Sequence, residues 1–145
     1  MQQWVHWSQG SYQSATPNPS VNNLTFELYP DITDYPDEVL FQTGFANLGD
    51  NRPARLFSSY PQATLDLHFA YMAEHGIDGV ALQRFIAVTF DPVFKQNLDS
   101  IAVRLRRAAE KHNRGFYMMY DITGCLLYTS PSPRDLSTSR MPSSA

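Results

Sequence analysis

Cysteine is nearly absent from the sequence, and so are long apolar runs. Cys125 is the only cysteine in the 145 residues, which excludes an internal disulfide framework and a cysteine-based zinc site. No stretch approaches the roughly 18 consecutive apolar residues of a membrane-spanning helix, so we expect no membrane partner. Residues 1–10 lack the basic start and the apolar run of a signal peptide, so none is predicted there.

Positive charge, histidine and glycine are also sparse. The formal net charge is -3, and this mild acidity argues against a nucleic-acid partner, which selects for a basic surface. The four histidines have no metal-ligand spacing, and residues 84–92 (RFIAVTFDP) are too bulky for a phosphate-binding loop. We therefore predict no metal and no cofactor. A calcium loop has a tight acidic pattern with a glycine, so we interpret as a solvated loop the acidic run of Asp31, Asp34, Asp37 and Glu38.

The composition that is present indicates one globular domain. The chain is 43% hydrophobic and 13% aromatic, which is too apolar for a disordered protein. Residues 1–61 carry aromatic clusters between turns rich in proline and asparagine. We expect ordered loops there, with one short strand near residues 54–60 (ARLFSSY).

Two helices are predicted in the second half of the chain. In residues 61–76, the apolar side chains Leu65, Phe69 and Met72 recur at helical spacing, and Gly76 suits the left-handed position after the helix. The second helix covers residues 91–113. Asp91 can cap its first turn and is followed by a proline, which favours the first helical position.

Each helix precedes an apolar strand, at residues 77–86 (IDGVALQRFI) and 115–122 (GFYMMYDI). The order helix–strand–helix–strand predicts an α/β fold with a parallel βαβ unit and a right-handed crossover. Side chains alternate between the faces of a strand, so Gln83 and Asp121 are expected to share a face near the two C-terminal ends. In α/β barrels the active site lies at that rim.

Several blocks of residues occur in the order found in one group of enzymes. Together they resemble bacterial glycoside hydrolases related to the endo-α-mannosidases of family 99, whose relatives are often labelled xylosidase/arabinosidase. The FYMMYD strand also resembles a strand of the α-1,3-glucanases of family 71. The blocks are residues 4–8 (WVHWS), 28–35 (LYPDITDY), 48–60 (LGDNRPARLFSSY), 65–85 (LDLHFAYMAEHGIDGVALQRF) and 116–124 (FYMMYDITG).

The resemblance implies that residues 1–124 are the N-terminal part of a (β/α)8 barrel, with the first barrel strand before Trp4 missing. In the endo-α-mannosidases both working carboxylates lie later in the barrel, so the main acid/base pair is expected beyond Gly124 and the fragment is expected to be inactive. A polysaccharide substrate suggests a secreted or periplasmic parent. One alternative is a non-catalytic carbohydrate-binding barrel, and another is a doubly wound α/β domain of different function. The oligomeric state stays open.

Four candidate substrate-binding residues come from the two strands. Asp121 contacts a sugar hydroxyl, belongs to the catalytic apparatus or caps the turn that follows it. Gln83 and Arg84 can bind sugar hydroxyls, or Arg84 pairs with a nearby acid. Tyr120 can stack on a sugar or belong to an aromatic cluster that seals the end of the barrel.

Two further candidates come from the N-terminal aromatic block. His6 and Trp7, together with Trp4, either form a platform for the apolar face of a pyranose or seal the end of the barrel as an aromatic cluster. His68 lies within the first predicted helix and is interpreted as structural.

The last residues follow a different pattern. Residues 125–135 (CLLYTSPSPRD) and 139–145 (SRMPSSA) can be back-translated into DNA that resembles the two ends of an adapter used in transposase-based library preparation. The residues between them would then encode the variable index. We therefore expect residues 125–145 to be a disordered tail of artefactual origin. A natural tail rich in serine and proline is the alternative.

Overall fold

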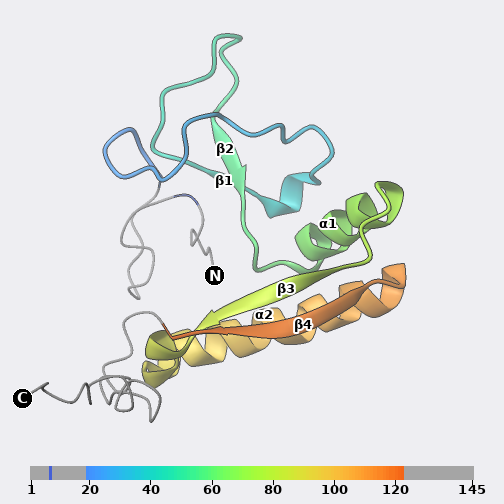
Figure 1. The fold of residues 1–145 in the computed structure, drawn as a ribbon. Coiled ribbons are helices and arrows are strands. Elements are labelled where there is room, and N and C mark those ends of the chain that lie inside the picture. Colours follow the sequence, from blue (N-terminus) through green and yellow to red (C-terminus); the bar gives the residue numbers. More distant parts are fainter. Residues whose placement is uncertain (1–6, 8–18, 123–145) are drawn as a thin grey trace, which may run out of the picture.

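The computed structural model describes residue 7 and residues 19–122 of the chain. Its long elements follow the predicted order: α1 (Gln62–Glu74), β3 (Gly79–Phe85), α2 (Pro92–His112) and β4 (Gly115–Asp121) (Figure 1). The first half contains two short strands, β1 (Leu40–Gln42) and β2 (Arg55–Phe57). Short 3₁₀ helices precede β1 (Asp37–Val39) and follow β3 (Ile86–Phe90). The fold class is therefore α/β, as predicted.

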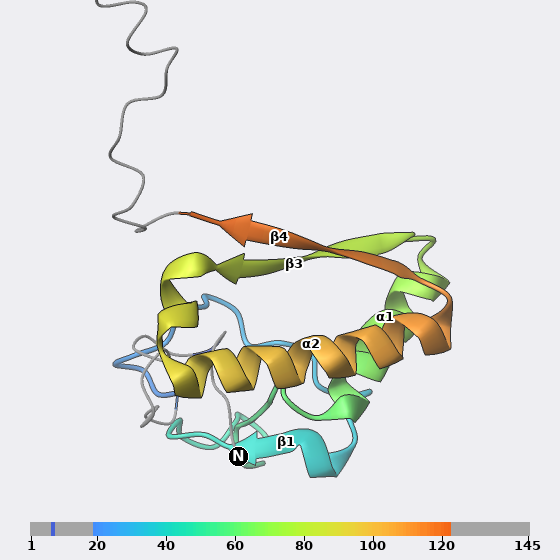
Figure 2. The ribbon, with the colours of Figure 1, turned by 90° about the horizontal axis from the view of Figure 1, so that it is seen from below.

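β3 and β4 form a two-stranded parallel sheet whose register runs from Gly79 opposite Gly115 to Phe85 opposite Asp121. Because α2 connects the two strands, the predicted βαβ unit is confirmed. Figure 2 shows both long helices on one face of this sheet. The core lies between the helices, and Val80, Leu82, Phe116 and Met72 pack against it; its buried members are Leu65, Phe69, Leu105, Ala108 and Ala109.

The N-terminus of α2 is capped as the sequence predicts. The carboxylate of Asp91 accepts hydrogen bonds from the backbone N–H groups of Val93 and Phe94, at 2.8 and 3.0 Å. These two donors have no partner within the helix, so the cap satisfies them. Pro92 occupies the first turn. At the other end, Asn113 adopts the left-handed conformation that ends the helix, with φ of 51°.

The C-terminus of α1 closes at the predicted glycine. Gly76 has a φ of 70°, a conformation that side chains with a Cβ disfavour. The N–H of Ile77 donates to the carbonyl of Met72 at 2.8 Å, and the N–H of Gly76 donates to the carbonyl of Ala73. This pair of bonds is the Schellman arrangement, which turns the chain directly from α1 toward β3.

Gly79 fixes the start of the parallel sheet. A Cβ at this position would lie 2.4 Å from the carbonyl oxygen of Gly115 on the neighbouring strand. The N–H of Gly115 also donates to the carbonyl of Asp78 at 2.8 Å. The two backbones therefore approach each other more closely than any residue larger than glycine permits at position 79.

The first half departs from the sequence prediction in one respect. We expected one short strand near residues 54–60, and β2 confirms it, but β2 also pairs antiparallel with the unpredicted β1. Strands as short as β1, which lies between prolines 36 and 53, have too little alternation to be recognised.

Among residues 7 and 19–122, no helix is long and apolar enough to cross a membrane.

Candidate functional site

Gln83 and Asp121 meet at the C-terminal ends of the two parallel strands. The amide Nε2 of Gln83 donates a 2.7 Å hydrogen bond to Oδ2 of Asp121. Val80, Leu82 and Phe116 pack toward the helices, so the alternation of side chains sends Gln83 and Asp121 to the other face. The structure thus confirms that the two predicted residues share a face at this rim, while their binding role stays a prediction.

The outer sheet face, as we call it, is the face of β3 and β4 turned away from the helices. Tyr117 is 64% exposed and Met119 is 39% exposed on it. The face therefore combines a wide apolar surface with one polar pair at its end. Its members in the two strands are Gly79, Ala81, Gln83, Phe85, Gly115, Tyr117, Met119 and Asp121.

This arrangement has the chemistry of a polar ligand site beside an aromatic ring. A carboxylate accepts hydrogen bonds, and an amide both donates and accepts them, so Gln83 and Asp121 match the hydroxyl groups of a polyol. The ring of Tyr117 offers a flat apolar surface on the same face. β3 and β4 contain one carboxylate, that of Asp121, so the pair provides an acceptor but no second acid.

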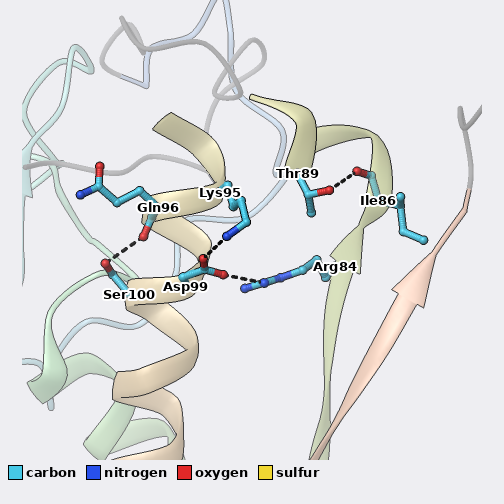
Figure 3. A network of polar contacts seen from close by, with 7 residues as sticks. All are labelled: Arg84, Ile86, Thr89, Lys95, Gln96, Asp99 and Ser100. Carbon is cyan, nitrogen blue, oxygen red and sulfur yellow. Dashed lines mark hydrogen bonds and ion pairs between the residues drawn. The ribbon is translucent and has the colours of Figure 1, made fainter. Parts of the chain in front are cut away.

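Arg84 points to the opposite side of β3, where it meets α2 (Figure 3). Its guanidinium donates to the carboxylate of Asp99 at 2.7 Å, and Lys95 donates to the second oxygen of the same carboxylate at 2.9 Å. These hydrogen bonds, from Lys95 first and Arg84 next, lower the pKa of Asp99. The Arg84 side chain is only 13% exposed. The geometry favours the ion-pair alternative and separates Arg84 from the Gln83–Asp121 pair.

Tyr120 and Trp7 lie apart from that pair. Tyr120 is opposite Arg84 in the register, so it is on the helix side of β4, although it is 62% exposed beyond the packed region. The indole Nε1 of Trp7 donates to the carbonyl of Phe57 at 2.8 Å, and its ring makes edge contacts with Phe26 and Phe57. The predicted aromatic cluster describes Trp7 better than a sugar platform does. The other predicted residue of that block, His6, lies outside the described residues.

Tyr35 is a residue of interest that sequence reasoning missed. Its ring stacks on Phe57 with centroids 4.3 Å apart, and its hydroxyl is 2.7 Å from Nε2 of His68 on α1. Burial raises the pKa of Tyr35 to about 12, so the hydroxyl keeps its proton at neutral pH, and the tautomer of His68 decides which of the two groups donates. This contact ties the first half of the chain to α1 and fits the structural role predicted for His68.

A shallow groove of about 460 Å³ runs along α2, and it too escaped the sequence analysis. Its polar groups contact one another: Lys95 pairs with Asp99, and the Ser100 hydroxyl donates to the Gln96 carbonyl (Figure 3). Among residues 7 and 19–122, no cluster of histidine, cysteine, aspartate or glutamate could hold a metal ion.

Comparisons with known proteins add no candidate to this geometry. No protein-family model, no curated protein and no solved structure matches the chain.

Proposed function

We propose that residues 1–124 belong to a (β/α)-barrel protein of the glycoside hydrolase type and contribute part of its carbohydrate site. In this proposal β3 and β4 are two neighbouring barrel strands, and their outer sheet face is turned toward the barrel interior. The observation that carries the proposal is the 2.7 Å pair of Gln83 and Asp121 at the C-terminal ends of parallel strands. Active sites of such barrels lie at that end.

The face on which the pair lies also supports the proposal. In a parallel sheet both faces are normally covered, one of them by helices. Here the helices cover one face, and the other combines small, polar and aromatic side chains. Such a face suits a site lined by hydrogen-bonding groups better than it suits a second layer of helices.

A second candidate, a binding module without catalysis, is favoured by the single carboxylate. Glycoside hydrolysis generally uses two carboxyl groups that flank the scissile bond, one as acid and one as base or nucleophile. Asp121 is the only carboxylate in β3 and β4. We therefore expect the 145-residue chain to bind sugar without cleaving it under either candidate.

The test is a binding titration of the full chain, followed by NMR, with manno-, xylo- and α-1,3-gluco-oligosaccharides. We expect one of these sugars to shift the amide signals of Gln83 and Asp121. Asp121→Ala and Gln83→Ala should each weaken that binding about tenfold, because each removes a side chain that would form hydrogen bonds with the sugar. Hydrogen bonds to charged groups contribute about 1.5–3 kcal/mol.

The matched control is Asp99→Asn, which removes a carboxylate on the helix side of the sheet and should leave sugar affinity unchanged. Release of reducing sugar by the same preparations is measured in parallel. If none of the three sugars binds, or if Asp99→Asn weakens binding as much as Asp121→Ala, the proposed site is wrong. Hydrolysis by the wild-type chain would refute the expected inactivity.

A further inference from the structure

β4 is an edge strand with none of the features that usually protect an edge. In the described residues it pairs only with β3, so the backbone groups on its other side have no strand beside them. In Figures 1 and 2, β3 lies between β4 and the β1–β2 pair, which leaves β4 outermost. Its sequence, GFYMMYD, has no proline and no charge before Asp121. Native edges are commonly blocked by proline, charge or a bulge.

The other edge of the sheet is better protected. β3 carries Arg84 within the strand, and its guanidinium is held on the helix side by Asp99. An inward-pointing charge of this kind is a recognised defence of edge strands, because a new strand would have to approach next to it. Pairing with another chain is therefore expected at β4 rather than at β3.

The side chains of β4 complement a second copy of the same strand in antiparallel orientation. With Met118 at the two-fold axis, Tyr117 of each copy lies opposite Met119 of the other. Aromatic rings and methionine sulfur attract each other, and both side chains are exposed in the single chain. Asp121 of each copy then lies opposite Gly115 of the other, so the two Asp121 carboxylates lie at opposite ends of the strand pair.

Parallel pairing of the two copies is disfavoured by the same residues. Two parallel β4 strands in register would bring Asp121 of each copy beside Asp121 of the other. Like charges directly opposite each other destabilise a sheet. The carboxylate of Asp121 therefore favours the antiparallel arrangement, which places the two carboxylates far apart.

We propose that the chain forms a two-fold dimer in which β4 pairs antiparallel with β4 of a second copy. The dimer contains a continuous four-stranded sheet in the order β3–β4–β4–β3, with the helices of both copies on one face. This inference concerns the 145-residue chain, because in the complete barrel of the proposed function the next strand would pair with β4. It rests on the edge of β4 and not on the Gln83–Asp121 pair, so it is tested separately from sugar binding.

The test is sedimentation velocity of the full chain over a wide range of concentrations. We expect the wild-type chain to pass from monomer to dimer as concentration rises. The double variant Tyr117→Lys with Met119→Lys should weaken the dimer about tenfold, because two pairs of like charges face each other across the interface. The double variant Tyr117→Lys with Met119→Glu turns the same two contacts into opposite-charge pairs and should dimerise more tightly than the double-lysine variant.

Val103→Lys is the matched control. It places the same charge on an apolar residue that is 50% exposed, but on α2, and should dimerise like the wild type. Circular dichroism of every variant verifies that the helices are retained. Any of three results overturns the proposal: a wild-type monomer at all concentrations, assemblies that grow beyond the dimer, or equal dimerisation of the two double variants.

Discussion

Replacing Gly79 by alanine should destabilise the protein, although alanine usually stabilises a chain relative to glycine. The added Cβ would lie 2.4 Å from the carbonyl oxygen and 2.8 Å from the carbonyl carbon of Gly115. Both are backbone atoms, so the clash cannot be relieved by rotating a side chain. The start of β4 must move away from β3, and this also stretches the hydrogen bond from Gly115 to Asp78.

The magnitude follows from three contributions. Overpacking of this kind costs about 1–3 kcal/mol, and a weakened backbone hydrogen bond costs about 1 kcal/mol more. Against these, alanine reduces the freedom of the unfolded chain, which contributes about 0.4–1 kcal/mol of stability. The net loss is about 2 kcal/mol, equivalent to a fall in Tm of about 5 °C for a domain of this size.

Urea denaturation followed by circular dichroism measures this loss. Gly49→Ala is the matched control, because a Cβ there meets nothing within 4 Å, and it should leave the free energy of unfolding unchanged or slightly increased. If Gly79→Ala is as stable as Gly49→Ala, the close approach of the two strands is not a constraint on the fold.

Two further substitutions test the hydrophobic core and the lowered pKa of Asp66. Phe69→Ala should lower the free energy of unfolding by about 3–5 kcal/mol, because Phe69 is fully buried between the helices, whereas Val103→Ala on the exposed face of α2 should change it little; equal effects would contradict the assigned core. Burial opposes ionisation of Asp66, but hydrogen bonds from Lys111 and Gln62 outweigh it and lower its pKa. Its contribution to stability is therefore present above its unfolded pKa of about 4 and is lost as pH falls through the lower folded pKa, so Asp66→Asn should show a smaller acid-induced fall in Tm than the wild type. Parallel pH profiles of Tm for the two proteins would refute this.

The second half of the fold was predictable because its signals are local. Asp91 and Pro92 mark the start of α2, and the observed cap uses the same carboxylate. Gly76 marks the end of α1, and its positive φ confirms the reason for a glycine there. Alternation along two strands was enough to bring Gln83 and Asp121 to one face.

The first half was less predictable because its contacts join residues distant in sequence. The stack of Tyr35 on Phe57 and the contact of Tyr35 with His68 depend on the tertiary fold, and no periodic pattern in the sequence predicts them. The same limit applies to Arg84. Its position in the strand predicts which face it occupies, but its partner on α2 follows only from how that helix crosses the sheet.

The parallel pairing of β3 with β4 has a consequence for how the protein is made. Translation delivers the chain from the N-terminus, so β3 leaves the ribosome well before its partner strand. Because α2 separates the two strands, both helices can pack on Val80 and Leu82 before residue 115 is synthesised. The parallel sheet can therefore form only after both helices have been synthesised. A nascent chain that ends just after α2 contains the residues of both helices but not the strand that pairs with β3.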